Sequence, residues 1–367
     1  MKSILLDARW LSTGIGAYTL NLVKQLGLRD DVRLRAITLP QHAAALKPYC
    51  DEVELVDAAM YSIREQFDIA RAARDSKVLH IPHYNAPLLY KGVLLVTILD
   101  LTHILDRTYK NSLKSKIYAR PMLTLVSKKA AHIFTLSEYS KRAIVEHLHV
   151  AEDKVTVTYC GVGPQFFPEP RESAQQIVQR ECGVTCPYIL FVGNLKPHKN
   201  IEGLLQAFAL TRRRAARDCE LLIIGEDAAG GPALRGLATS LGIGTATKFI
   251  GRVSDELLRS AYSAAEFTVL PSFEEGFGLP VLESMACGTP VACSRAASLP
   301  EVAGDAAEYF DPHNIESMAS AVERLLESKG HRERLRQCGF VNARRFTWSA
   351  CAERHAQVYR EHLLSAS

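Results

Sequence analysis

The chain has 367 residues, which is too long for one ordinary hydrophobic core and suits two domains. Hydrophobic residues make up 47% and charged residues 23%, a balance typical of globular proteins, and the net charge of +4 is too small to indicate a nucleic-acid partner. The nine scattered cysteines favour reduced thiols in the cytosol over disulfides or zinc. The apolar run in residues 1–9 is too short for a signal peptide, and no stretch approaches a membrane span.

The first predicted unit is a strand, a glycine-rich turn and a helix. Residues 3–7 form a short apolar run typical of buried strands, and apolar residues recur at helical spacing in residues 17–28. The turn between them contains Gly14 and Gly16. This order is typical of nucleotide-binding βα units, although any tight βα turn needs glycine for conformational reasons.

Further strand-like runs alternate with helical stretches through the first half of the chain. We expect strands at residues 32–38, 53–56, 78–81, 93–99, 132–136 and 155–159. Alternating units of this kind predict a parallel sheet with helices on both faces. Because parallel sheets present functional groups at the carboxyl ends of their strands, the loops that follow these runs are the places to look for a site.

Polar side chains occupy two of these loops. His83, Tyr84 and Asn85 lie between two prolines, and we interpret them as acceptor-facing groups; a proline-shaped loop with surface polar residues is the alternative. Ser137 directly precedes a helical stretch and is a favourable N-cap residue.

Residues 110–130 combine six lysines and arginines with apolar residues at helical spacing. One interpretation is an amphipathic helix that lies on an anionic membrane surface. The other, which is commoner, is a solvated basic face on a helix interrupted by Pro121.

A proline- and glycine-rich segment at residues 161–170 predicts the domain boundary. After it we expect a second βα series, with strands at residues 188–192, 220–224, 247–250, 267–270 and 290–293 and helices at 314–329, 331–345 and 348–364. Lys196 and Lys199 follow the first of these strands, where a lysine would neutralise a phosphate. Ser254 precedes a helix as a candidate cap.

Residues 272–291 carry the strongest signal in the chain. Gly276 and Gly278 precede a helix that tolerates Pro280 in its first turn, so backbone N–H groups lie uncovered at its positive end. Glu275 and Glu283 flank this predicted anion site, and carboxylates accept hydrogen bonds well from hydroxyl groups. An anion pocket edged by hydroxyl acceptors fits a sugar nucleotide better than a free phosphate.

This segment resembles the E-x7-E motif of the retaining glycosyltransferases of family 4. The match runs from Glu275 to Glu283 with the family's Gly-Phe-Gly-Leu-Pro between them and its Met-Ala-Cys-Gly-Thr-Pro after them. For the two glutamates alone, a capped helix with glutamates on its solvent-exposed face would explain the pattern. However, twenty consecutive residues match the sequence pattern of the family. The resemblance covers nearly the whole chain, densely in the second half.

The resemblance implies an α/β protein of the GT-B fold, in which two Rossmann-like domains face each other across a cleft. Residues 1–165 would form the acceptor-side domain, with the C-terminal helix at about 348–367 packed back on it. Residues 166–347 would bind the nucleotide sugar.

The same resemblance implies roles for individual residues. Lys199 would contact the donor phosphate, Glu275 the sugar hydroxyls and Glu283 the ribose, whereas Asn194 stands where the family usually has arginine. The donor-binding positions that it implies are Gly14, Gly16, Gly193, Asn194, Lys196, Arg252, Gly276, Phe277, Gly278, Leu279 and Glu283.

One strand end departs from the family pattern. Leu99 replaces the family histidine that approaches the transferred sugar, whereas Asp100 is retained. His103, on the following loop, is our candidate to replace the histidine. Ser137 falls in a segment similar to the family's Ser-x-x-Ser-Lys/Arg, so substrate contact is an alternative to capping.

The implied reaction is transfer of a hexose, with retention of configuration, from a nucleotide diphosphosugar to a hydroxyl of a glycan or lipid-linked acceptor. Neither a metal ion nor another cofactor is expected. GDP-mannose is favoured as donor because the segment looks most like polysaccharide and O-antigen mannosyltransferases, and UDP-sugars remain open. We expect a cytoplasmic enzyme. The lipid-linked acceptors of many family members extend this expectation to peripheral contact at the inner face of the membrane. A non-catalytic sugar-nucleotide-binding partner subunit and an epimerase of the same fold remain as alternatives.

Overall fold

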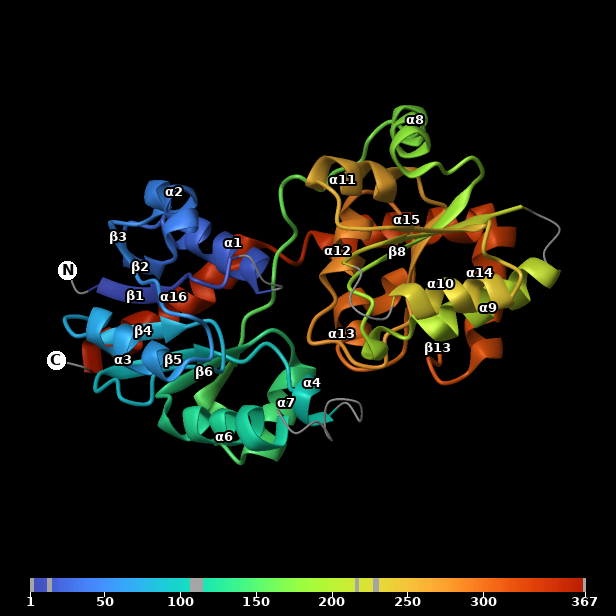
Figure 1. Cartoon of the computed structure of the whole chain (residues 1–367). Helices are drawn as coiled ribbons and strands as arrows, with labels where there is room; N and C mark the ends of the chain where they lie inside the picture. The colour runs from blue at the N-terminus through green and yellow to red at the C-terminus, as the bar shows by residue number, and fades with distance from the viewer. Residues whose placement is uncertain (1–2, 12–14, 106–114, 215–217, 227–230, 366–367) are drawn as a thin grey trace. The chain divides into compact units, whose positions relative to one another are not determined.

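The structure, a computed structural model, describes residues 3–11, 15–105, 115–214, 218–226 and 231–365 (Figure 1). The chain divides into two compact units. Unit 1 is formed by Met1–Gly161 together with Thr347–Ser367, and unit 2 by Val162–Phe346.

Within its described residues, unit 1 forms a seven-stranded parallel sheet with the strand order β3-β2-β1-β4-β5-β6-β7. The strands are β1 (Ser3–Asp7), β2 (Arg33–Thr38), β3 (Glu52–Leu55), β4 (Val78–Ile81), β5 (Val93–Thr97), β6 (His132–Thr135) and β7 (Val155–Val157). The order along the chain reverses between β1 and β4, where Ile4 lies opposite Val78 and Leu6 opposite His80. Such a reversal opens a crevice at the carboxyl ends of the two strands.

Helices cover both faces of this sheet, as the parallel topology requires. On one face, Ile69, Val126 and Ile144 pack against the strands in a single core. On the other face, the first and last helices of the chain contact each other. The helices are α1 (Gly16–Leu26), α2 (Ala43–Leu46), α3 (Ile63–Ala72), α4 (Thr102–Leu105), α6 (Arg120–Lys129), α7 (Glu138–Leu148) and α16 (Trp348–Ser365), with single turns η1 (Pro40–His42), η2 (Lys47–Tyr49), η3 (Ser115–Ala119) and η4 (Glu152–Lys154).

Unit 2 repeats the pattern with a parallel sheet of six described strands in the order β10-β9-β8-β11-β12-β13. They are β8 (Tyr188–Val192), β9 (Glu220–Ile224), β10 (Thr247–Ile250), β11 (Phe267–Leu270), β12 (Val291–Ser294) and β13 (Ala307–Phe310). Here the order reverses between β8 and β11, where Phe267 lies opposite Ile189.

Alternate side chains of β8 show how both faces of this second sheet are buried. Ile189 and Phe191 join the core formed with α9 (Ile201–Arg214) and α14 (Ile315–Glu327), whereas Tyr188 and Leu190 join the core formed with α8 (Arg171–Cys182) and α11 (Asp255–Ala264). The helices are α8 (Arg171–Cys182), α9 (Ile201–Arg214), α10 (Gly231–Ser240), α11 (Asp255–Ala264), α12 (Leu279–Ala286), α13 (Leu299–Ala303), α14 (Ile315–Glu327) and α15 (Lys329–Ala343), with turns η5 (Pro197–Lys199) and η6 (Gly304–Ala306).

The predicted parallel sheets are therefore confirmed, and most strand bounds agree with the prediction to within one residue. β5 and β7 each end two residues before the predicted end, at Thr97 and Val157, and β13 was not predicted. Within the described part of the chain, no helix combines the length and the apolar character needed to cross a bilayer.

Candidate functional site

The loops that follow β8 and β11 lie at the strand-order reversal of unit 2 and are bonded to each other. The N–H of Phe273 donates to the carbonyl of His198 at 2.8 Å. The amide of Asn200, a residue in the left-handed region with φ of 55°, donates to the carbonyls of Pro271 at 3.1 Å and Pro312 at 2.9 Å. These bonds fix the two loops at the edge where doubly wound sheets bind ligands.

Lys199 and Glu275 meet across this pair of loops. Lys199 Nζ donates to Glu275 Oε1 at 2.5 Å, and Ser272 Oγ donates to the same oxygen at 2.9 Å. The two charged side chains are only 14% and 11% exposed, and Ser298 Oγ holds the Glu275 backbone carbonyl at 2.9 Å. The structure therefore brings together two residues that lie 76 positions apart in the chain and places their charges at the reversal point.

Helix α12 begins beside this pair without a side-chain cap. Its N-cap residue is Gly278, with φ of 92°, and a Cβ there would lie 2.6 Å from Leu299 Cδ2. Phe277 is buried, and its ring packs edge-on against Phe346 at 5.9 Å between centroids. Phe277 can therefore offer a ligand only its backbone, whereas the turn from Gly276 to Leu279 places the positive end of the helix dipole next to Glu275 and Lys199.

Glu283 lies one turn further along α12 and is half-buried. Tyr262 donates its hydroxyl hydrogen to Glu283 Oε2 at 2.9 Å. Burial raises the pKa of Glu283 to about 7, with the Tyr262 hydrogen bond opposing the shift and Asp255 adding to it. This carboxyl group therefore titrates near neutral pH, unlike an ordinary surface glutamate.

The turn after β8 comes very close to the backbone of the neighbouring strand end. A Cβ on Gly225 would lie 1.8 Å from the carbonyl oxygen of Gly193, so this approach requires glycine. Asn194 folds back on its own loop, where its Oδ1 accepts from the Lys196 N–H at 3.3 Å. The side chains of Lys196 and Arg252 are exposed.

Unit 1 carries an aromatic cluster at its own reversal point, between β1 and β4. The His83 ring stacks on Trp10 at 4.3 Å and lies 4.2 Å from the ring of Tyr84. His83 Nδ1 accepts from the Asn85 N–H at 2.9 Å, which makes Nε2 the protonated nitrogen of the neutral ring. His83 and Asn85 are buried and Tyr84 is half-buried, so the three predicted residues form one rigid loop.

A buried charged network supports that loop. Arg9 is fully buried and pairs at 2.7 Å with both Asp7 and Glu65, which are also fully buried. Glu65 Oε2 in turn accepts from Asn85 Nδ2 at 2.7 Å, and the Tyr118 hydroxyl donates to Asn85 Oδ1 at 2.5 Å. Although burial alone would lower it, the pKa of Arg9 is raised by Asp7 and Glu65, so the guanidinium stays charged.

The sequence analysis did not single out Arg9 or Glu65. A partial signal exists at Arg9, because a charged residue two positions after a buried strand is unusual. Glu65 gives no such signal, because a glutamate in the first turn of a helix is ordinary.

Comparison with known proteins identifies the family of the chain. Residues 12–166 match the family model described as Glycosyltransferase Family 4, and residues 176–340 match that described as Glycosyl transferases group 1. The chain belongs to this glycosyltransferase family. It is 28% identical to O-antigen chain mannosyltransferase B of Escherichia coli, over 95% of this chain and 96% of that protein.

Solved structures show the fold of the glycosyltransferase. Sucrose-phosphate synthase from Thermosynechococcus elongatus matches with a TM-score of 0.80 at 21% identity, covering 100% of both chains. HepE from Anabaena, in complex with UDP-glucose, matches with a TM-score of 0.80 at 16% identity, covering 98% of this chain and 100% of that one. These likenesses confirm the predicted GT-B fold class.

The remaining positions that the sequence analysis discussed in the first unit follow β5 and β6 or begin α1. Asp100 Oδ1 accepts from the Thr102 N–H at 2.9 Å at the start of α4, and the carbonyl of half-buried Leu99 accepts from Ser140 Oγ at 3.2 Å. Ser137 is buried and caps α7 by accepting from the Ser140 N–H at 3.0 Å. Gly16 begins α1, where a Cβ would lie 1.9 Å from the Leu11 carbonyl oxygen. Gly14 and the side chain of His103 lie outside the described residues.

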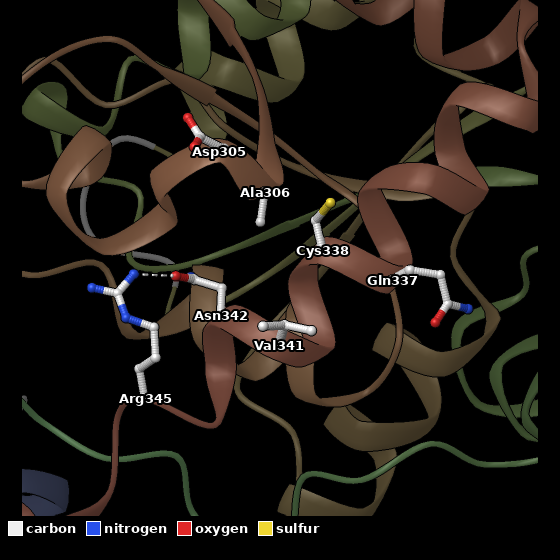
Figure 2. A pocket seen from close by; sticks show the side chains of 7 residues that line it. All are labelled: Asp305, Ala306, Gln337, Cys338, Val341, Asn342 and Arg345. Carbon is white, nitrogen blue, oxygen red and sulfur yellow. Dashed lines mark hydrogen bonds between the residues drawn. The ribbon is translucent and has the colours of Figure 1, made fainter.

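Other features of the described glycosyltransferase residues do not add to this site. No group of three or more potential metal-ligating side chains is found among them. A hollow of about 420 Å³ lies elsewhere on unit 2, where α15 passes η6 (Figure 2). Its one lining arginine, Arg345, already donates to Asn342 Oδ1 at 3.0 Å, and the lining is mainly apolar.

Proposed function

We propose that this glycosyltransferase moves a hexose from a nucleotide diphosphosugar to a hydroxyl of a glycan or lipid-linked acceptor, with retention of anomeric configuration. The observation that carries the proposal is the Lys199–Glu275 pair at the reversal point of unit 2, beside the uncapped start of α12. A cation and a carboxylate in contact with each other, beside a helix N-terminus, suit a ligand that is anionic at one end and rich in hydroxyls at the other.

Each group in unit 2 then has one task. Lys199 and the backbone from Gly276 to Leu279 would hold the diphosphate, which develops negative charge as the glycosidic bond breaks. Both described bonds to the Glu275 carboxylate use Oε1, so Oε2 would accept from the sugar hydroxyls. Glu283 would accept from the ribose, and Gly193 would let the donor approach the backbone. Exposed Arg252 would contact the base.

On the acceptor side, His83, Tyr84 and Asn85 would bind the incoming glycan. The acceptor oxygen forms its bond to the anomeric carbon on the face that the phosphate oxygen leaves. The acceptor proton passes to the leaving phosphate, which is the nearest strong acceptor. This route requires no strong protein base, so Leu99 in place of the family histidine is compatible with it. Asp100 and His103 would assist from the loop after β5.

The phosphate charge would be met by Lys199 and the α12 dipole, so the reaction would not need a metal ion. Mannose is the favoured sugar, since O-antigen chain mannosyltransferase B, which aligns along 96% of its own length, is named a mannosyltransferase. A UDP-sugar is the other candidate, because HepE was solved with UDP-glucose. The nine free thiols support work in a reducing compartment, which we take to be the cytoplasm at the inner face of the membrane.

Incubation of the purified protein with a panel of labelled sugar nucleotides tests the proposal. We expect slow hydrolysis of one donor without acceptor, faster transfer when an acceptor glycan is added, activity that survives a metal chelator, and a product anomer that matches the donor by NMR. Interconversion of the donor sugar would instead favour an epimerase. Binding with no turnover in the presence of acceptors would favour a partner subunit.

A further inference from the structure

Tyr262 is a buried residue whose hydroxyl group bonds to a carboxylate of the candidate site. Its side chain is fully buried, and the hydroxyl donates to Glu283 Oε2 at 2.9 Å. This bond joins α11 to α12 across 21 positions of the chain. A phenolic hydroxyl in a core needs a partner, but a backbone carbonyl would satisfy it equally well. The partner here is instead the carboxylate that the proposed function assigns to the donor ribose.

Contacts of the ring and of the backbone hold Tyr262 in place. The ring packs edge-on against Phe166, with 5.9 Å between the centroids and 82° between the planes. Thr289 Oγ1 donates to the backbone carbonyl of Tyr262 at 2.6 Å, and the Ala265 N–H donates to the same carbonyl at 3.2 Å. The hydroxyl therefore donates from a fixed point, and the bond restricts the side chain of Glu283.

The same bond divides the two oxygens of the Glu283 carboxylate. Among the residues that the structure describes, the one bond to this carboxylate comes from Tyr262 and uses Oε2. Oε1 is therefore left to accept from a ligand. Because Glu283 is half-buried, a ligand at the start of α12 can reach this oxygen while Tyr262 holds the other one.

The surroundings other than Tyr262 make ionisation of Glu283 more difficult. Burial is the main cause of its raised pKa, and Asp255 adds to the shift, whereas the Tyr262 hydroxyl opposes it. The other titratable groups in this neighbourhood are the buried thiol of Cys287 and the ion pair of Arg259 with Glu169. Helix α15, which also packs against α12, brings Arg336 to the Gly288 carbonyl beyond the far end of α12. Burial raises the pKa of Tyr262 well above its ordinary value, so its hydroxyl remains a donor throughout the neutral range.

We propose that Tyr262 is a positioning residue for the donor site, because its hydroxyl fixes the Glu283 carboxylate and keeps it an acceptor for the hydroxyl groups of the donor ribose. This inference rests on the ribose contact in the proposed function. Without the Tyr262 hydroxyl, the carboxylate would rotate more freely and would ionise less readily. A side chain that is already ordered binds a ligand without the cost of ordering it.

Tyr262→Phe removes the hydroxyl and keeps the ring against Phe166. Carbon-13 NMR of the glutamate carboxyl groups, in the full chain without ligand, follows the titration of Glu283, and Glu283→Gln identifies its signal. We expect a midpoint near pH 7 in wild type. The midpoint should lie about one pH unit higher in Tyr262→Phe, because the ionised carboxylate loses a hydrogen bond.

Tyr188→Phe is the matched control. Tyr188 is buried in the same core as Tyr262, and its hydroxyl donates to the Ala261 carbonyl at 2.7 Å. Its loss also removes one buried hydrogen bond, so the two variants should lose similar stability. The midpoint of Glu283 should nevertheless keep its wild-type value in Tyr188→Phe.

Calorimetry with GDP-mannose and with UDP-glucose connects the bond to donor binding. The nucleotide that wild type binds more tightly should bind Tyr262→Phe about threefold more weakly at pH 7, because less of the carboxylate is then ionised. At pH 9 the two proteins should bind it almost equally. Tyr188→Phe should match wild type at both pH values.

A wild-type midpoint in Tyr262→Phe would overturn the positioning role. An affinity loss of equal size at pH 7 and pH 9 would also overturn it and would leave Tyr262 as a structural residue of the core. Failure of wild type to bind either nucleotide would count against the proposed transferase instead. The NMR midpoint alone would then decide whether Tyr262 controls Glu283.

Discussion

Lys199 is held by Glu275, yet the pairing leaves it able to act on a ligand. An ammonium group has three N–H donors, and the described contact with Glu275 uses one of them. A diphosphate at the start of α12 would meet the remaining donors while Glu275 keeps the side chain in place. The pair thus positions the cation before the ligand arrives, which is the arrangement that makes electrostatic stabilisation effective.

Lys199→Met should lower kcat by about a hundredfold to a thousandfold, because removal of one preorganised donor from a developing oxyanion costs that much in comparable sites. The effect on KM for the donor should be smaller, since the charge on the leaving phosphate is greatest in the transition state. Steady-state rates with the cognate donor measure both constants, and Lys199→Arg should recover part of the loss.

Lys196→Met is the matched control for this prediction, because Lys196 lies in the same loop with its side chain exposed. It should keep kcat within a few-fold of wild type. Equal losses in both variants would mean that the loop needs positive charge in general. Wild-type turnover in Lys199→Met would leave the Lys199–Glu275 bond as a purely structural contact.

With Glu283 bound to the ribose as proposed, donor affinity should depend on pH in the neutral range. The pKa of Glu283 is about 7, and the ionised form accepts hydrogen bonds from ribose hydroxyls more strongly than the protonated form, so affinity should rise by up to about tenfold between about pH 6 and pH 8. The raised pKa also predicts that folding stability falls as pH rises from the ordinary glutamate value toward 7, because the unfolded chain then releases a proton that the buried Glu283 retains. Calorimetry with the intact sugar nucleotide avoids the terminal phosphate of a free nucleotide, which titrates near pH 6.

Glu283→Gln should bind the donor more weakly and with a flat pH profile. An unchanged slope in this variant would assign the pH dependence to another group.

The predictability of the candidate site depended on how far apart its parts lie in the chain. Glu275, Gly278 and Glu283 belong to one continuous segment, so their sequence spacing was enough to predict the start of α12. The Arg9–Glu65 bond joins residues 56 positions apart, and no local pattern indicates it. Likewise, the burial of Phe277 against Phe346 depends on tertiary packing that the sequence motif does not reveal.

At the scale of elements, the strands that are buried on both faces were the easiest to predict. β8, β9 and β11 have the expected bounds, because continuous apolar runs between turn signals have few alternatives. β10 and β13 are the two edge strands of the described sheet, and each has three half-buried residues. The bounds of β10 were nevertheless predicted, whereas β13 was missed. Its sequence, with Glu308 and Tyr309 at the centre, lacks the apolar run that identifies a central strand.

Helix α16 is held in unit 1 by buried polar groups as well as by apolar contact. Tyr18 bonds to His355 Nε2 at 2.9 Å, and His80 Nδ1 bonds to Tyr359 at 2.6 Å, with all four side chains buried. Burial lowers the pKa of His355 to about 4 and also lowers that of His80. Both rings are therefore neutral in the folded protein at neutral pH.

Acid should consequently destabilise unit 1. Below about pH 6.5 the histidines of the unfolded chain take up protons, whereas the buried rings of the folded unit do not. The free energy of unfolding is therefore highest above that pH and falls as pH drops toward 4. His355 alone should contribute about 3 kcal/mol to this fall. Denaturant unfolding followed by tryptophan fluorescence measures the stability of unit 1 at each pH, because Trp10 and Trp348 both lie in unit 1. His355→Gln, which removes one titrating ring, should flatten the pH dependence. A variant with the wild-type slope would assign the acid sensitivity to other groups.

At the scale of the whole molecule, the chain passes between the two units twice. The compact units divide at Gly161 and again at Phe346, whereas the sequence analysis set its boundaries at residues 165 and 347. The first passage falls at the start of the proline- and glycine-rich segment, where composition alone signals a change. The second has no such signal, because helical periodicity runs through residues 331–345 and 348–364 and does not show which sheet each helix covers.

This division gives the two units different requirements for folding, which fragments of the chain can test. Unit 2 is continuous, and the strands, helices and candidate donor site described for it lie between Val162 and Phe346. Expressed alone, residues 162–346 should fold cooperatively and bind the donor nucleotide. Residues 1–161 alone should not, because without α16 the hydroxyl of Tyr18 and the ring of His80 lose buried partners at about 1–3 kcal/mol each, in addition to the apolar area that the helix covers. A small domain has only about 5–15 kcal/mol of net stability to lose.

Circular dichroism and calorimetry of each fragment measure these outcomes, and a peptide of residues 347–367 added in trans should restore cooperative unfolding to residues 1–161. A stable fragment 1–161, unaffected by the peptide, would show that α16 is dispensable for the first unit.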